Sequence, residues 1–221
     1  EPRYAFRPNL WPKNIPRLSQ KAEQILLHEP NLAIMAPYTD ATIKHALKKA
    51  QVDTLTLKPT DGFEVYPENV RLLGKKLGAE KAAEKLIMEF HNKLKKHKGK
   101  ELPSRTMISY VAEHVAGKNT TFHDAVKIAD GENLAATHGY KGHTRVNLEE
   151  IVSWQPKYII TSCRYRDKKK CQTKANRLAA KPGIRLLTKK NLTKVVAIPT
   201  AILSANGTGL IELVKRLEGL R

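Results

Sequence analysis

The chain has 221 residues, of which 41% are hydrophobic and 28% charged, so it is long enough to bury a core and ordinary in composition for a folded protein. No stretch approaches the roughly 18–20 consecutive apolar residues needed to span a bilayer, and the first residues lack the charged and apolar regions of a signal peptide. The formal net charge of +19 favours anionic partners: nucleic acid, an acidic membrane surface or a negatively charged small ligand. A proteome that is basic throughout would give the same charge without such a partner, so both explanations stay open.

After a stretch rich in proline and arginine, the sequence alternates between helical and strand patterns from residue 21 onward. This alternation favours an α/β fold with parallel sheets covered by helices. We expect strands over residues 32–36, 54–57, 106–111, 158–162 and 195–198, and helices over residues 40–50, 122–129, 147–153 and 209–218.

Two distant segments, residues 21–36 and 147–162, share one pattern. Each is a short amphipathic helix ended by proline, which cannot donate the helical hydrogen bond, and each continues into a buried strand. Helix–proline–strand joints also occur singly in α/β proteins, but two with the same spacing predict two lobes of similar construction. In register, Glu23 matches Glu149, Ile25 matches Ile151, Pro30 matches Pro156, and Ile34 matches Ile160.

A long helical pattern covers residues 67–98. Pro67 suits the first turn of a helix, and Glu68 suits the positive end of its dipole. Some 32 residues would give a helix of roughly 48 Å, weakened locally by Gly74 and Gly78. A coiled-coil helix is the alternative. We expect a spine over residues 67–98 that joins an N-terminal lobe, residues 1–66, to a C-terminal lobe, residues 99–221.

In open α/β sheets, ligands bind outside the carboxyl ends of the strands, which selects a few loops as candidate sites. Four histidines of the C-terminal lobe fall near predicted strand ends, an arrangement that would suit a metal or haem site. They lack the spacing of a ligand pair, which favours surface histidines instead. The four are His114, His123, His138 and His143.

The two cysteines, Cys163 and Cys171, are eight positions apart, with no second pair at zinc-ligand spacing. In an oxidising compartment they could close a short loop as a disulfide, and in a reducing cell they would stay thiols. The spacing leaves these two states open.

The sequence contains no recognisable catalytic motif. There is no Gly-x-Ser-x-Gly elbow, no phosphate-cradling Gly-x-x-x-x-Gly-Lys and no Gly-x-Gly-x-x-Gly. We therefore expect a binding protein rather than an enzyme.

Six segments in order resemble the metal-chelate class of periplasmic substrate-binding proteins, which serve ABC importers for ferric siderophores, haem and cobalamin. Together they cover the chain from about Ile15 to its end. The segments are residues 72–78 (LLGKKLG), 116–124 (AGKNTTFHD), 129–136 (ADGENLAA), 146–151 (VNLEEI), 155–160 (QPKYII) and 195–204 (VVAIPTAILS).

This resemblance implies export to the periplasm or cell surface, delivery to a membrane permease, and a ligand held in a cleft between two lobes. The ligand would be a ferric siderophore, haem or a corrinoid, with no covalent cofactor and no resident metal. Arginine, tyrosine and histidine in the C-terminal loops favour a ferric chelate or haem over cobalamin, and Arg164 and Arg166 suit an anionic ligand. The family's binding positions carry over to Pro37, Tyr38, Lys58, Gly117, Lys118, Asn119, Thr120, Thr121, Tyr140, Arg164, Tyr165 and Arg166.

The chain departs from this family in its first part. Members open with a strand and a helix before the part that matches Ile15, and here these are missing. We expect an N-terminal lobe that is incomplete, domain-swapped or completed by a partner. We also expect a monomer, or a dimer if the lobe is completed by swapping. Asp130-Gly131 also stands where members usually have Gly-Gly.

A basic nucleic-acid-associated protein is the alternative from another class. It would use the dense basic runs at residues 93–98 and 164–170. Aromatic residues make up only 6% of the chain, so no base-stacking platform is evident. We therefore prefer the importer component.

Overall fold

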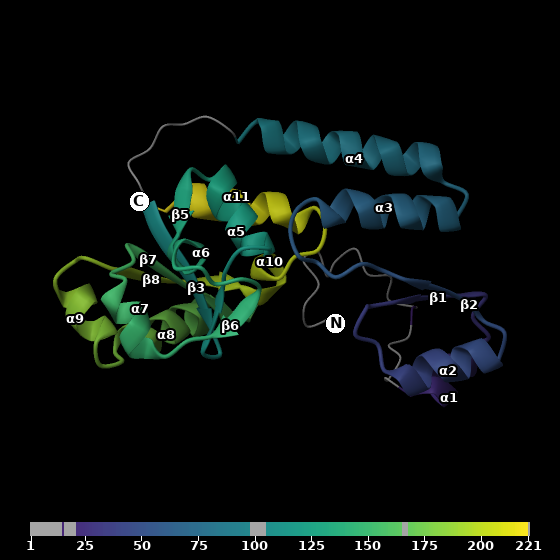
Figure 1. Ribbon diagram of the computed structural model, residues 1–221, viewed down its shortest axis with the longest axis horizontal. Coiled ribbons are helices and arrows are strands. Elements are labelled where there is room, and N and C mark those ends of the chain that lie inside the picture. Colours follow the sequence, from purple (N-terminus) through teal and green to yellow (C-terminus); the bar gives the residue numbers. More distant parts are fainter. Residues whose placement is uncertain (1–14, 16–20, 98–104, 165–167, 221) are drawn as a thin grey trace. The chain divides into compact units, whose positions relative to one another are not determined.

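The computed structural model describes residues 15, 21–97, 105–164 and 168–220. These residues form two compact units (Figure 1). Unit 1 comprises Thr60–Phe63 and the chain from Glu89 onward, and unit 2 comprises the described residues up to Pro59 together with Glu64–Met88. The α/β prediction is confirmed, since both units contain small sheets covered by helices.

Unit 2 contains a small β–α–β motif. Strands β1 (Leu32–Met35) and β2 (Asp53–Thr56) pair in parallel, and α2 (Ala41–Lys49) connects them. The side chain of Asp40 begins α2 by accepting a hydrogen bond of 2.7 Å from the backbone N–H of Thr42. Helix α1 (Ala22–Leu26) packs beside α2, and the buried centre of the motif consists of Met35, Ile43 and Leu47.

The single helix expected over residues 67–98 is two helices, α3 (Val65–Lys76) and α4 (Glu80–Lys95). Gly78 has a φ of +64°, which ends α3 in a left-handed turn. The Ala79 N–H then bonds the Gly74 carbonyl at 2.8 Å, and the Gly78 N–H bonds that of Lys75 at 3.4 Å. A Cβ on Gly74 would lie 2.5 Å from the Cβ of Ala83, so this glycine allows the two helices to approach closely.

The repeated helix–proline–strand pattern is confirmed in both units. Helix α1 leads into β1, and α7 (Leu148–Ser153) leads into β7 (Tyr158–Cys163). The residue before each proline has a positive φ, 44° at Glu29 and 49° at Gln155. The two joints therefore share their backbone conformation as well as their spacing.

Unit 1 is built on a six-stranded sheet with the strand order β6–β4–β3–β7–β8, to which β5 is added beside β3. Strands β5 and β7 each pair in parallel with β3, and β8 pairs in parallel with β7. Strand β4 pairs antiparallel with β3 and with β6. The bounds are β3 (Arg105–Val111), β4 (His114–Ala116), β5 (Gly131–Asn133), β6 (His143–Arg145) and β8 (Lys194–Pro199).

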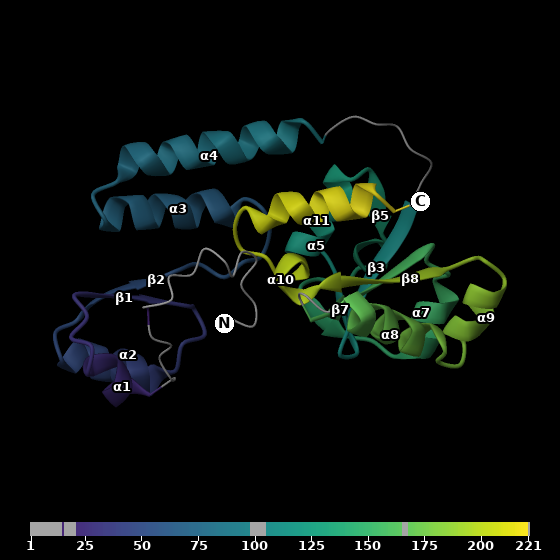
Figure 2. The same cartoon turned by 180° about the vertical axis from the view of Figure 1, so that it is seen from behind.

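Helices cover both faces of this sheet (Figures 1 and 2). One face packs against α5 (Thr121–Ile128) and α11 (Gly209–Glu218), with α6 (Leu134–Thr137) and α10 (Thr200–Leu203) as short connections. The other packs against α7, α8 (Lys168–Ala179) and α9 (Ile184–Lys189). Because strand side chains alternate between faces, neighbouring core residues such as Met107 and Ile108, both fully buried, point to opposite layers.

Candidate functional site

A pocket of about 380 Å³ lies within unit 1. Its volume is at the lower end of the range typical of small-molecule sites. Among the described residues, its lining contains hydroxyl, amide and imidazole groups but no Asp, Glu, Lys or Arg. The lining residues are Thr60, Ser109, Val111, His114, Ala116, Thr121, Phe122, His143, Ser162, Thr200, Leu203, Ser204 and Asn206.

The pocket opens at the carboxyl ends of the parallel strands. Ser109 and Val111 end β3, Ser162 is the last residue but one of β7, and Thr200 directly follows β8. This is the edge of the sheet at which the sequence argument expected a ligand. The hydroxyl of Thr200 also links the ends of β7 and β8, because it donates a hydrogen bond of 2.9 Å to the carbonyl oxygen of Cys163.

A two-residue turn sets His114 at the pocket. Val111 pairs with His114 across Ala112 and Glu113, whose φ angles of 49° and 65° are both left-handed. Hairpin turns of this length need such angles but usually take glycine, asparagine or aspartate there. The chain thus holds a strained turn at the pocket edge, and the Arg145–Glu113 ion pair lies beside it.

The imidazole of His114 is oriented by the same turn. Its Nδ1 lies 2.7 Å from the carbonyl oxygen of Ala112, so Nδ1 must carry the proton and donate. In the neutral ring, Nε2 then keeps a lone pair, which is the form in which histidine binds a metal. His143 lies on the neighbouring strand, where it pairs with Ala116, two residues from His114 on the same face. Both histidines line the pocket.

Thr60 reaches the pocket because its short segment is attached to α5. The Asp124 carboxylate accepts a hydrogen bond of 2.9 Å from the Phe63 N–H, and a Cβ on Gly62 would lie 2.7 Å from the same oxygen. The centroid of the Phe63 ring lies 6.2 Å from that of the Phe90 ring. Asp124 therefore holds residues 60–63 against α5 within unit 1.

The predicted loop 117–121 makes close main-chain contacts. A Cβ on Gly117 would lie 2.1 Å from the carbonyl oxygen of Tyr140, and Lys118 exchanges backbone hydrogen bonds with Tyr140 and Gly142. Thr120 is buried and begins α5, with its hydroxyl bonded to the Gly117 carbonyl and the His123 N–H. The backbones of Gly117 and Tyr140 therefore lie side by side. Asn119, in the turn that follows Gly117, has a φ of 60°.

The predicted Tyr140 has its hydroxyl engaged. It donates a short hydrogen bond to the Glu150 carboxylate, which raises the pKa of this tyrosine. The centroid of its ring lies 5.7 Å from that of Trp154. The Trp154 ring in turn stacks on the His138 ring, with 4.6 Å between the centroids. Tyr140 and His138 therefore belong to an aromatic cluster rather than to the lining of the pocket.

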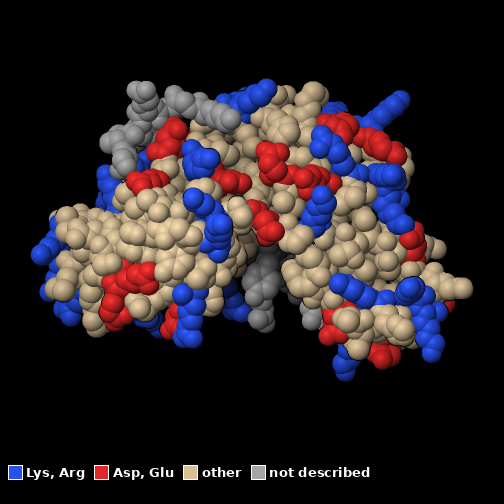
Figure 3. Space-filling model, viewed as in Figure 1, with Lys and Arg blue, Asp and Glu red and all other residues tan. Residues whose placement is uncertain are grey.

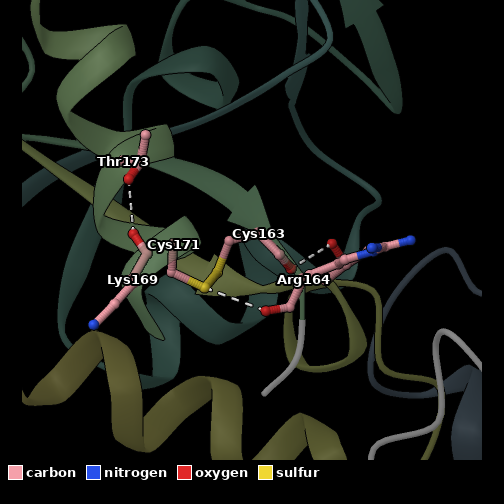
Figure 4. The surroundings of a disulfide bond; sticks show 6 residues. Cys163, Arg164, Lys169, Cys171 and Thr173 are labelled. Carbon is pink, nitrogen blue, oxygen red and sulfur yellow. Dashed lines mark hydrogen bonds between the residues drawn. A yellow bond between two sulfur atoms is a disulfide. The ribbon is translucent and has the colours of Figure 1, made fainter. Parts of the chain in front are cut away.

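Cys163 and Cys171 form a disulfide that joins the end of β7 to α8 (Figure 4). Of the two states left open by the sequence, the structure has the oxidised one. Arg164 follows β7 directly and is exposed, and its side chain extends away from the disulfide on the side opposite to Lys169. The predicted Tyr165 and Arg166 lie outside the described residues.

The three predicted positions of unit 2 follow its parallel strands. Pro37 and Tyr38 come after β1, where the Pro37 carbonyl accepts a hydrogen bond from Lys44 at 3.1 Å and Tyr38 is 86% exposed. Lys58 comes after β2 and forms an ion pair of 2.9 Å with Glu68. All three lie at the carboxyl edge that the strand rule selects.

Of the predicted binding residues, Thr121 is the one that lines the pocket of unit 1 within the described chain. His114 and His143, which the sequence analysis weighed and favoured as surface residues, also line it. The residues that sequence reasoning did not single out are mostly small hydroxyl residues. Position after a strand points to Thr200 and to the loop that contains Thr60, but nothing local distinguishes Ser109.

Two features are absent from the described residues. No cluster of three or more His, Cys, Asp and Glu side chains suited to a metal ion occurs among them. None of the helices they form is both long and apolar enough to cross a membrane.

Comparisons with known proteins match most of the chain. The model of the family described as periplasmic binding protein matches residues 10–199. The uncharacterized ABC transporter substrate-binding lipoprotein YvrC of Bacillus subtilis (strain 168) is 27% identical over 154 residues, covering 66% of this chain and 47% of its own. The chain thus spans about half the length of the curated relative it matches.

Solved structures share the fold. A possible iron-binding (periplasmic solute-binding) protein from Staphylococcus epidermidis ATCC 12228 superposes with a TM-score of 0.75 at 18% identity, covering 90% of this chain and 78% of its own. A periplasmic heme binding protein from Pseudomonas aeruginosa has a TM-score of 0.73 at 20% identity, with coverages of 90% and 74%. These similarities confirm the two-lobed α/β fold class expected from the sequence.

Proposed function

The chain belongs to the periplasmic binding protein family, and we propose that it captures an iron chelate, a ferric siderophore or haem, or else a corrinoid, and delivers it to the permease of an ABC importer. The family match over residues 10–199 carries this proposal. The family is one of binding proteins rather than enzymes, in agreement with the expectation from the missing catalytic motifs. The nucleic-acid alternative has no support among the matches.

The proposal places the protein outside the cytoplasm, in the periplasm or at the cell surface. The name of the Bacillus relative calls that protein a lipoprotein. The Cys163–Cys171 disulfide suits an oxidising compartment. Both observations support an exported protein.

We place part of the ligand site in the pocket of unit 1. The hydroxyl groups there are donors for the oxygen atoms of a chelate, and the Nε2 of His114 supplies a lone pair for iron. Because no carboxylate is among the described lining residues, an anionic chelate would meet no like charge in the pocket. This favours a ferric chelate or haem, in line with the iron-binding and heme-binding descriptions of two structural neighbours.

Ligand titration tests the proposal. The purified chain is titrated with haemin, a ferric hydroxamate, a ferric catecholate and cyanocobalamin, with the fluorescence of Trp11 and Trp154 and the visible absorbance of each ligand as readouts. Saturable binding of one of them that persists at raised salt is the expected result. If none of the four ligands bound saturably, the proposed ligand class would be contradicted.

Paired variants test the site itself. His114→Ala with His143→Ala is expected to weaken binding at least about tenfold, the loss of one good polar or metal contact. His28→Ala with His45→Ala removes two exposed histidines of unit 2 and serves as the control. Arg164→Ala with Arg166→Ala tests the predicted basic positions, and unchanged affinity there would remove them from the site.

A further inference from the structure

Residues 164–194 carry an extreme local charge. They contain twelve of the chain's 40 Lys and Arg residues but one of its 21 Asp and Glu residues, Asp167. This segment begins directly after β7 and contains α8, α9 and the first residue of β8 in unit 1. More than half of the net charge of +19 therefore comes from about a seventh of the chain.

The basic side chains of this segment's described residues are on the surface, whereas four of its apolar side chains are buried. Ala175, Leu178, Ile184 and Leu187 are all at most 8% exposed and pack into the core. We call the exposed basic set the α8–α9 surface. It consists of Arg164, Lys169, Lys170, Lys174, Arg177, Lys181, Arg185, Lys189, Lys190 and Lys194.

The helical spacing aligns these charges rather than spreading them. Lys170, Lys174 and Arg177 are four and three residues apart, so they follow one face of α8. Arg185 and Lys189 are four apart on α9. Like charges at this spacing destabilise a helix by a few tenths of a kcal/mol per pair, so helix stability gives no reason for them.

Several basic residues elsewhere in the chain form ion pairs with acidic side chains. Arg71 pairs with Glu84 at 2.7 Å, Lys76 with Asp53 at 2.5 Å, and Arg216 with Glu212 at 2.8 Å. The segment 164–194 offers no Asp or Glu among its described residues. In Figure 3, Lys and Arg atoms lie along the margin of unit 1 that α9 occupies in Figure 1, whereas acidic atoms gather over α7, which carries Glu149 and Glu150.

Two large apolar side chains stand exposed among the charges. Leu186 on α9 is 64% exposed, and Leu192, just before β8, is 49% exposed. Leucine beside lysine and arginine is the combination that binds at a lipid interface, because the cations attract anionic headgroups and the apolar groups enter the acyl boundary. The described part of this segment contains no aromatic residue on which a nucleic-acid base could stack.

We propose that the α8–α9 surface of unit 1 binds the anionic phospholipid headgroups of a membrane, with Leu186 and Leu192 entering the interface. This contact is independent of the ligand pocket, since none of these residues lines it. It would hold unit 1 at the bilayer by a peripheral attachment.

Vesicle co-sedimentation tests this proposal on the whole chain. Vesicles of phosphatidylcholine with phosphatidylglycerol are compared with vesicles of phosphatidylcholine alone, at low and at raised salt. The chain is expected to bind the anionic vesicles and to lose most of this binding without phosphatidylglycerol. No binding to the anionic vesicles would overturn the proposal.

A charge-matched pair of variants separates the surface from the net charge. Lys174→Gln, Arg177→Gln, Lys181→Gln and Arg185→Gln together remove four charges of the α8–α9 surface, and binding is expected to weaken at least about tenfold. Lys48→Gln, Lys49→Gln, Lys81→Gln and Lys85→Gln remove four exposed charges of unit 2 and are expected to change it less than about twofold. Equal losses in the two variants, both checked for folding by circular dichroism, would show a diffuse charge effect and overturn the proposal.

The leucines separate a bilayer from a nucleic acid. Leu186→Ser with Leu192→Ser is expected to weaken vesicle binding severalfold and to leave any binding to double-stranded DNA unchanged. Vesicle binding unaffected by these substitutions, together with tighter binding to DNA, would assign the surface to a nucleic acid instead.

Discussion

The guanidinium of Arg105 donates a hydrogen bond of 3.0 Å to the main-chain carbonyl oxygen of Glu218, although only 5% of Arg105 is exposed. The same nitrogen also contacts the carbonyl of Leu220 at 3.0 Å, and the other terminal nitrogen donates to that of Ala129 at 3.1 Å. These oxygens lie at the ends of α11 and α5, where helix carbonyls lack intrahelical partners and carry partial negative charge. A buried cation is thus held by the carboxyl ends of two helices.

Replacing this arginine is expected to be costly. Arg105→Met keeps an apolar stem of similar length but leaves buried carbonyls without a donor, which should lower the free energy of unfolding by about 3 kcal/mol. Arg71→Met, which removes an exposed ion pair with Glu84, is the control and should cost less than about 1 kcal/mol. Urea unfolding followed by circular dichroism measures both. Equal losses would mean that Arg105 contributes no more than a surface ion pair.

Gly117 is expected to tolerate no side chain. A Cβ there would lie 2.1 Å from a main-chain oxygen of Tyr140, and backbone cannot move aside as a flexible side chain can. Gly117→Ala should therefore destabilise unit 1 by about 2 kcal/mol or more. In Gly219→Ala the new Cβ would lie 3.4 Å from its nearest neighbour, an ordinary contact, and stability should hardly change. Thermal unfolding of the two variants compares them.

The sequence predicted the strongly periodic elements well. The strand expected over residues 158–162 is β7 (Tyr158–Cys163), and the helix expected over residues 209–218 has those bounds in α11. Strands β4, β5 and β6 have three residues each, too few to show alternation. Helix α8 begins inside the basic run 164–170. Its many charged residues obscure the helical pattern of its buried positions, Ala175 and Leu178.

The tertiary roles could not be predicted in the same way. Arg105 is one of 40 basic residues, and only the fold shows that helix ends surround it. The pattern over residues 67–98 is helical on both sides of the break, and Leu77 and Leu86, which continue its apolar stripe, are 60% and 47% exposed in the structure. For the pocket, strand ends gave the correct edge of the sheet, but Thr60 arrives from a segment far away in sequence.

The disulfide is expected to stabilise unit 1 measurably. Closing a loop of about nine residues removes chain entropy from the unfolded state worth about 2–3 kcal/mol. Cys163→Ser with Cys171→Ser should lower the free energy of unfolding by that amount, and adding a reductant to the native chain should have the same effect. A reductant that further destabilises the double variant would indicate an effect unrelated to this bond.

His123 is expected to make stability depend on pH. Burial lowers its pKa below the ordinary 6.5, with Lys127 and Lys118 adding to the shift and Asp124 opposing it. The unfolded chain therefore takes up this proton more readily than the folded one, and the stability present above pH 6.5 falls as the pH drops through the lowered pKa. In an NMR titration, the His123 ring should show a midpoint below 6.5. His123→Gln should flatten the stability profile in this window, whereas exposed His45→Gln should not.

The strained turn before His114 predicts a substitution that raises stability. Ala112 has a φ of 49°, which a residue with a Cβ adopts at a cost of about 1 kcal/mol and asparagine adopts more readily. Ala112→Asn should therefore raise the free energy of unfolding by about 0.5–1 kcal/mol while keeping the carbonyl that orients the imidazole of His114. Ala180→Asn, exposed just beyond α8 in a segment without that strain, is the comparison and should give no gain. A gain at Ala112 with unchanged ligand affinity would show that strain in the turn is not needed for binding. A gain accompanied by weaker affinity would show that the strained backbone itself sets the position of His114.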